Sequence, residues 1–316
     1  VTGVQTCALP ICLQNPTARD AAVKITYNTP GGPVSRQTVR LDAHARKTIR
    51  VNDDVPAGDV SVTVDSDRPI VAERSMYWDA RRGGHNSIGT DSPAREWFLA
   101  EGSTRWGFDT YILLQNPGGS GVTASITFLT EAGPVKGPDL PVGAGSRRTV
   151  DARAYVGDAD FSTRVASDGG IICERSMYWN NGSGKAGHDT IGVKQASNLC
   201  FLAEGTTAYG FETFVLIANP NPEENDVQVT YMTPHGEEVF PGVTIAPWSR
   251  MTIDVNAILP GTDVSVQVSG NYGVAVERAM YWNGRGGGHD SIGFARSLEA
   301  PAPLRSPRLS PRLSTP

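Results

Sequence analysis

The stretch that decides the fold is ERSMYW at residues 73–78, which a glycine-rich connection joins to GHNSIG at residues 84–89. The chain repeats both motifs twice with small changes, as ERSMYW and ERAMYW at 174–179 and 277–282 and as GHDTIG and GHDSIG at 187–192 and 288–293. The copies of the first motif begin 101 and 103 residues apart. A period of this length is too long for a solenoid repeat and matches one small domain. The repeats therefore predict three successive domains.

Further shared motifs place the boundaries of the three repeat units. FLAEG stands at residues 98–102 and 201–205, and LQNP stands at 13–16 and 114–117. We therefore expect units at residues 12–95, 96–198 and 199–296, the first of which lacks the FLAEG strand. Residues 1–11 resemble a translated sequencing adapter and are expected to be non-native. Residues 297–316 are rich in Pro, Ser and Arg, which predicts a disordered tail.

Apolar and polar residues alternate within each unit. Val23, Ile25 and Tyr27 stand at every second position, and residues 124–128 and 227–231 repeat the pattern. Such alternation is typical of half-buried strands, and Gly, Pro and Asn turn signals separate the runs. No helical stripe is evident. We therefore expect an all-β fold, a tandem array of three antiparallel immunoglobulin- or fibronectin-III-like sandwiches with the first one truncated. A β-propeller is the rival, but each unit is about twice the length of a blade.

The first copy of the motif reads as a central strand with two occupied faces. One face carries Ile70, Ala72, Arg74, Met76 and Trp78, and the other carries Val71, Glu73, Ser75 and Tyr77. Each face holds one charge, and a buried charge is costly unless it is paired. Arginines before a second alternating strand recur with the same spacing as the glutamates. We therefore expect cross-strand ion pairs within each unit, Glu73–Arg46, Glu174–Arg147 and Glu277–Arg250.

The composition excludes several classes of function. The net charge of −5 and the pI near 5.6 give no electrostatic footprint for nucleic acid. No run of 18 apolar residues is present, so we expect no membrane span. Hydrophobic residues make up 39% of the chain, which is enough for packed cores and argues against a disordered protein.

The GH-D/N motif admits two interpretations. One is a metal, catalytic or ligand-binding site, for which His85, His188, Asp189, His289 and Asp290 are the candidate residues. The other is a turn into the last strand, in which Asp or Asn bonds to the backbone and Gly supplies a positive φ. The turn is favoured, because zinc usually needs three or four ligands and the first unit has Asn86 in place of an aspartate. We predict no metal site and no cofactor.

The acidic residues also permit a glycosidase interpretation. Glu101 or Glu204 would be the acid, and Glu174 or Glu277 the second carboxylate. The triplication argues against it, because an enzyme seldom carries one active site per small unit. No nucleophile, zinc-protease or phosphate-binding motif is present. We therefore expect a protein that is not an enzyme.

Two aromatic residues and two cysteines complete the candidates. Trp106 and Tyr209 occupy matching loop positions and could stack on sugar rings or anchor a protein partner. Packing between neighbouring units is the alternative, and it is favoured.

Cys173 and Cys200 stand at the adjoining ends of the second and third units. A disulfide between them is an open alternative to free buried thiols.

Taken together, the FLAEG, LQNP, SR-x-T and ERSMYW motifs resemble a family of secreted repeat domains found mainly in actinobacteria and related lineages. The resemblance covers residues 12–296 and implies an exported β-sandwich array without assigned catalytic residues. We expect a non-catalytic bacterial spacer, adhesion or binding module, secreted or on the cell surface, although this sequence shows no signal peptide. Its expected partners are extracellular glycan or a protein. The alternatives are a carbohydrate-binding module and, less favoured, a glycoside hydrolase or peptidase fragment.

Overall fold

The protein is mostly β in the computed structural model, and its strands form several antiparallel sheets, which confirms the all-β prediction. The structure describes residues 9–36, 38–182 and 184–295. The two-residue period is visible in β2 (Ala21–Thr29), where Ala21, Val23, Ile25 and Tyr27 are buried and the side chains between them are not. Within these described ranges, no helix has the length and apolarity that crossing a membrane requires.

The first unit contains two sheets. In one sheet the strand order is β5-β1-β7-β8; in the other, β3 and β4 pair with one edge of β2 and β6 pairs with its opposite edge. The strand that carries the first motif, β7, lies between β1 and β8, as a central strand should. The strands are β1 (Pro10–Gln14), β2, β3 (Gly32–Ser35), β4 (Val39–Leu41), β5 (Arg46–Arg50), β6 (Ser61–Ser66), β7 (Val71–Trp78) and β8 (Gly83–Ile88).

A single strand, β14 (Phe161–Asn180), runs through both halves of the second unit. Its first half pairs with β11 and β9, and its second half pairs with β10 and β15. The first unit divides the equivalent stretch into β6 and β7. The other elements are β9 (Ala94–Leu99), β10 (Asp109–Asn116), β11 (Val122–Thr130), β12 (Gly133–Val142), β13 (Ser146–Asp151), α1 (Arg153–Val156) and β15 (Lys185–Ile191).

The third unit repeats this plan around β22 (Ser265–Trp282). This strand pairs with β18 and β16 along its first half and with β17 and β23 along its second. The other elements are β16 (Ser197–Leu202), β17 (Glu212–Asn219), β18 (Asn225–Thr233), β19 (Gly236–Val239), β20 (Val243–Ile245), β21 (Ser249–Asp254), α2 (Val255–Ile258), β23 (Gly287–Ile292) and β24 (Phe294–Ala295). The one-turn helices α1 and α2 stand at matching positions and were not expected.

Each unit encloses its own hydrophobic core, and a fourth core lies between the second and third units. The three unit cores contain buried residues within 9–51, 97–173 and 200–276. The fourth joins side chains of both units, among them Phe98, Met177 and Trp179 from the second and Leu216 and Tyr281 from the third. The second and third units are therefore fused by burial of apolar surface as well as by the chain.

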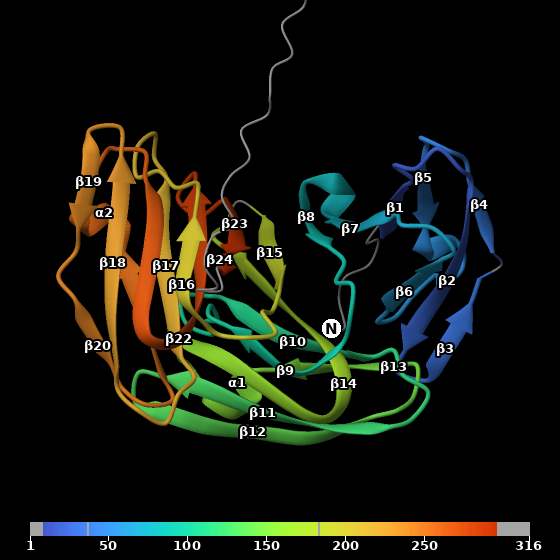
Figure 1. Ribbon diagram of the computed structural model, residues 1–316, viewed down its shortest axis with the longest axis horizontal. Helices are drawn as coiled ribbons and strands as arrows, with labels where there is room; N and C mark the ends of the chain where they lie inside the picture. Colours follow the sequence, from blue (N-terminus) through green and yellow to red (C-terminus); the bar gives the residue numbers. More distant parts are fainter. Residues whose placement is uncertain (1–8, 37, 183, 296–316) are drawn as a thin grey trace, which may run out of the picture.

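The units follow one another in an arc (Figure 1). The second unit, in green, joins the first, in blue, to the third, in orange. The hairpins that end in β8, β15 and β23 lie on the inner side of the arc, and β15 packs between β8 and β23. The hairpins that carry the repeated motifs are therefore neighbours in space.

Leu9 and Ile11 are buried in the first core, and Ile11 lies in β1. The non-native origin of residues 1–11 stays a prediction. Residues 1–8 and the predicted tail at 297–316 lie outside the described residues. Of the two alternatives left open for Cys173 and Cys200, the structure has the free buried thiols, which lie in two separate cores, and not the disulfide. Burial raises the pKa of both thiols, that of Cys200 to about 11.

Candidate functional site

The repeated residues meet at two junctions between successive units. At the first junction, Arg74, Trp78 and His85 of the first unit face the second unit's Glu174, Tyr178 and Asp189. At the second junction, Arg175, Trp179 and His188 of the second unit face the third unit's Glu277, Tyr281 and Asp290. Each junction thus takes Arg, Trp and His from one unit and Glu, Tyr and Asp from the next.

Strand geometry explains this division. Adjacent residues of a strand point to opposite faces, so Glu174 and Arg175 of β14 face different neighbours. Glu174 contacts Arg74 of the first unit, and Arg175 contacts Glu277 of the third. The central strand of the middle unit therefore takes part in both junctions.

Arg175 is the centre of the second junction. Its side chain is fully buried and contacts three carboxylates. Nη1 donates to Glu277 Oε2 at 2.6 Å and to the Glu101 carbonyl at 2.9 Å, and Nη2 donates to Glu101 Oε2 at 2.9 Å and to Asp290. The Ala100 amide donates to the other Glu277 oxygen at 2.6 Å. Buried carboxylates satisfied in this way are stable only while the guanidinium is present.

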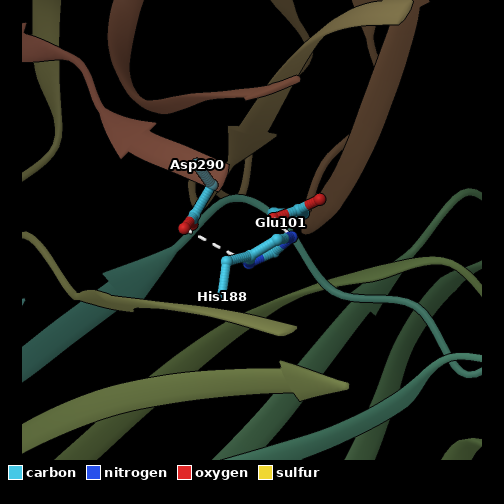
Figure 2. A group of neighbouring side chains, drawn as sticks. All are labelled: Glu101, His188 and Asp290. Carbon is cyan, nitrogen blue, oxygen red and sulfur yellow. Dashed lines mark ion pairs between the residues drawn. The ribbon is translucent and has the colours of Figure 1, made fainter. Parts of the chain in front are cut away.

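His188 lies between two of these carboxylates (Figure 2). Its Nδ1 is 3.2 Å from Asp290 Oδ1, and its Nε2 is 3.7 Å from Glu101 Oε2. Tyr281 donates to Glu101 Oε1 at 3.0 Å, and the ring of Trp179 packs against both His188 and Tyr281. Aromatic rings thus pack against the imidazole of the charged cluster.

The charges of the cluster shift several pKa values. Burial, together with Asp290 and Glu101, raises the pKa of Glu277 to about 7, although the Arg175 charge lowers it. Burial alone would lower the pKa of His188, but the charges of Asp290 and Glu101 outweigh it and raise that pKa. Three carboxylates thus face one arginine and one histidine, and a proton in the cluster relieves the excess negative charge.

The first junction has the same pattern but is more open. Arg74 Nη1 lies 3.0 Å from Glu174 Oε2, and Nη2 contacts Asp189. His85 Nδ1 lies 2.8 Å from Asp189 Oδ1. The side chains of Arg74 and Glu174 are 19% and 22% exposed, whereas those of their counterparts at the second junction are fully buried. Burial and the Arg74 charge lower the pKa of His85 to about 3.

The ion pairs predicted within each unit are not formed. No ion pair joins Glu73 to Arg46, Glu174 to Arg147 or Glu277 to Arg250 in the part of the chain that the structure describes. The prediction is wrong because a third strand lies between the two that were expected to pair. In the second unit, Leu113 pairs with Thr149 on one side and with Glu174 on the other. Two strand spacings amount to roughly 10 Å, which is beyond direct ion pairing.

The three arginines of these predicted pairs have other surroundings. Arg147 reaches back to the first unit and lies 2.8 Å from Asp59. Arg46 donates to the side chains of Cys12 and Thr48. Arg250 is buried, and burial lowers its pKa. Arg147 therefore strengthens the contact between units, and not the fold of its own unit.

The group Glu101, His188 and Asp290 has the composition of a metal site. Their ligand atoms lie within 4.8 Å of one another. The residues do not fit an ion, however, because the Arg175 guanidinium already contacts both carboxylates at the place where a cation would lie. Asp290 and Glu101 also approach opposite ring nitrogens of His188 and so cannot share one ion with a single nitrogen.

The GH-D/N motifs are strands and not turns. Their residues lie in β8, β15 and β23, and Asp189 and Asp290 contact the preceding unit's arginine and histidine. The three hairpins together line a cavity of about 610 Å³. The structure thus brings five candidate ligand-binding residues to one cavity, namely His85, His188, Asp189, His289 and Asp290.

Trp106 and Tyr209 lie apart from this cavity and are 74% and 85% exposed. Packing between units, the favoured alternative, is therefore wrong for both rings. Each has a left-handed backbone, with φ of 58° and 56°, followed by a glycine of positive φ. Such a backbone is strained for a large residue. Two units thus present an aromatic ring to solvent on the same kind of tight turn.

Glu101 contributes to the second junction through the FLAEG motif, a role that sequence analysis missed. The side chain of Glu101 is 4% exposed, whereas that of its counterpart Glu204 is 70% exposed. In the third unit, Arg278 bonds instead to Glu204, His289 and Ser291 of its own unit. The available signal was the repeated glutamate of FLAEG together with an arginine in the apolar strand of the ERSMYW motif.

No protein-family model and no curated protein matches the chain. Among solved structures, the chain is similar to the crystal structure of Thermotoga maritima 1070, with 19% identity, a TM-score of 0.30, and coverage of 33% of this chain and 96% of that one. It is also similar to the FMN-binding beta-glucuronidase from Facaelibacterium prausnitzii L2-6, with 11% identity, a TM-score of 0.16, and coverage of 87% of this chain and 39% of that one. Neither TM-score is high enough to bear on fold or function.

Proposed function

We propose that the protein is a non-catalytic, exported bacterial scaffold of three immunoglobulin-like sandwich units, at residues 12–95, 96–198 and 199–296. In this proposal the units are locked into a rigid arc that acts as a cell-surface spacer or adhesion module. The observation that carries the proposal is that the repeated charged residues contact a neighbouring unit. Arg74 and Arg175 bind carboxylates of the following unit, so the repeated motif joins units together.

Burial at the second junction supports this role over catalysis. Glu101 and Glu277, two of the glycosidase candidates, share the Arg175 guanidinium and have almost no accessible surface. A glycosidase pair must instead flank a substrate, with a carboxylate separation of roughly 5 Å or more. The apolar core between the second and third units adds the rigidity that a spacer needs.

Rigidity of the arc tests the proposal. We expect residual dipolar couplings from amides of all three units to fit one alignment tensor, because ion pairs join the units at both junctions. Three independent tensors would contradict the rigid scaffold. Turnover of a glycan or a peptide that is abolished by Glu174→Gln or Glu277→Gln would establish the hydrolase instead.

Carbohydrate recognition is the second candidate function, and the exposure of Trp106 and Tyr209 favours it. Aromatic faces on strained turns are suited to stacking against sugar rings. We expect Trp106→Ala with Tyr209→Ala to weaken binding to a bacterial or plant glycan on an array by about tenfold or more, as the loss of two stacking faces implies. The control is Phe294→Ala, another exposed ring. Glycan binding that survives loss of both rings would exclude this route, and so would an array without any binding.

A further inference from the structure

We propose that the contact between the second and third units depends on a bound proton, carried by His188 as an imidazolium, and that this contact weakens as the pH rises. The inference deepens the proposed scaffold and rests on its rigid arc, because it states the condition under which the third unit stays packed against the second. The side chain of His188 is 2% exposed and lies between a carboxylate of each unit, Glu101 and Asp290.

Both ring nitrogens of His188 face groups that accept hydrogen bonds. Nδ1 lies 3.2 Å from Asp290 Oδ1, where a bare lone pair would face a carboxylate oxygen (Figure 2). Nε2 lies 3.3 Å from the Tyr281 hydroxyl, which donates its single hydrogen to Glu101 Oε1 at 3.0 Å and so can only accept from the imidazole. Burial and the Glu101 charge raise the pKa of Tyr281 well above its usual range, so the hydroxyl keeps that hydrogen. Each ring nitrogen therefore carries a hydrogen, which makes His188 a cation.

The charges of the cluster require protons as well. Without them, three carboxylates would face the single positive charge of Arg175. A proton on His188 and a second on Glu277 make the cluster neutral, and unbalanced charge is costly where the side chains are buried. Burial, which raises the pKa of Glu277 to about 7, favours the second proton.

The charged and titratable groups around His188 come from four strands and from the segment after β9. Burial and Arg175 oppose the proton on His188, but the charges of Asp290 and Glu101 outweigh them and raise its pKa. Burial lowers the pKa of both other histidines of the hairpins, which are therefore neutral neighbours. The full set is Glu101 after β9, His85 of β8, Arg175 of β14, Glu277 and Tyr281 of β22, and His289 and Asp290 of β23.

The direction of the pH dependence follows from these shifts. An exposed histidine titrates near pH 6.5, so the contact takes up a proton wherever the pH lies between that value and the raised pKa of His188. Glu277 acts in the same direction, because its pKa of about 7 lies above its ordinary value of 4.5. The proton-linked part of the contact is therefore complete near pH 4.5 and is lost as the pH rises through 7 and beyond. Although burial raises it, the charges of His188 and Arg175 lower the pKa of Asp290, which opposes this trend only below its ordinary value of 3.8.

NMR of the full chain reads the proton on His188 directly. Long-range ¹H–¹⁵N spectra show which ring nitrogens of each histidine carry a hydrogen, and the signals that vanish in His188→Gln are those of His188. At pH 7, above the ordinary histidine pKa of about 6.5, we expect hydrogens on both nitrogens of His188 and on only one nitrogen of His85. A neutral His188 at this pH would overturn the proposal.

Denaturation of the full chain measures what the proton contributes. As the pH rises above about 6.5, the ratio of the folding constants of the unaltered protein and His188→Gln should fall about tenfold per pH unit, until His188 loses its proton. The matched control is His85→Gln, for which this ratio should stay constant over the same range. Burial and the Arg74 charge lower the pKa of His85 to about 3, so this residue is neutral there whether the chain is folded or unfolded. A constant ratio for His188→Gln, or an equal fall for both variants, would overturn the proposal.

Residual dipolar couplings separate this inference from the scaffold itself. One alignment tensor for all three units at pH 6, together with a neutral His188, would refute the bound proton and leave the scaffold standing. Independent tensors at pH 6 would refute the scaffold, and the inference with it.

Discussion

Replacement of Arg175 by methionine is expected to lower the free energy of unfolding by about 3–5 kcal/mol, the cost of breaking a buried ion pair from one side. Methionine keeps most of the side-chain volume, so the effect is electrostatic and not that of a cavity. The substitution leaves Glu101, Glu277 and Asp290 buried without the guanidinium that now contacts all three. Chemical denaturation, followed by tryptophan fluorescence, measures the change.

The repeats supply matched controls for Arg175→Met. Arg278→Met should cost only about 1 kcal/mol, because its partner Glu204 is mostly exposed and needs no counter-charge. Arg74→Met should lie between the two, since Glu174 keeps partial access to water. Equal costs at the three arginines would contradict an account in which burial between units determines the effect.

Replacement of Trp179 by alanine is expected to be similarly severe, at about 3–5 kcal/mol. The ring is 4% exposed and packs against Phe108, His188 and Tyr281. Its Nε1 donates to the Arg285 carbonyl of the third unit at 2.6 Å. The substitution therefore removes apolar contact and a hydrogen bond from the surface between the second and third units. Calorimetry should show the third unit unfolding separately from the second.

Trp282→Ala is the control for Trp179→Ala. The Trp282 ring is half-buried and packs against Phe211 and His289 of its own unit. Because it makes these contacts within one unit, its loss should cost clearly less and should not separate the units. If Trp282→Ala proves as damaging as Trp179→Ala, the ring matters within each unit and not at the junction.

The all-β fold was predictable because strict alternation, as in Val23, Ile25 and Tyr27, leaves few other structures. The continuity of β14 and β22 was not predictable. In the second unit the strand continues through Gly169 and Gly170, and different neighbours pair with its two halves. The free thiols of Cys173 and Cys200 likewise depended on which core each residue joined.

The junctions were only half predictable. The sequence shows that Glu174 and Arg175 carry opposite charges on opposite faces of an apolar strand, which demands partners on both sides. It does not show where those partners lie, because an intervening strand and a neighbouring unit are both tertiary features. The sequence favoured an ion pair between two strands of the same unit. This pair cannot form, because β10 lies between β13 and β14. A charge on each of the two occupied faces of a repeated strand could have pointed to the adjacent units.

The central claim is that the repeated arginine and glutamate join successive units. A double-mutant cycle with Arg175→Met and Glu277→Gln tests it most directly, compared with a cycle that combines Arg250→Met and Glu277→Gln. We predict a coupling energy of about 2–3 kcal/mol between Arg175 and Glu277, which are in contact, and below about 1 kcal/mol between Arg250 and Glu277. The reverse order would mean that the charges pair within one unit, which would contradict the account.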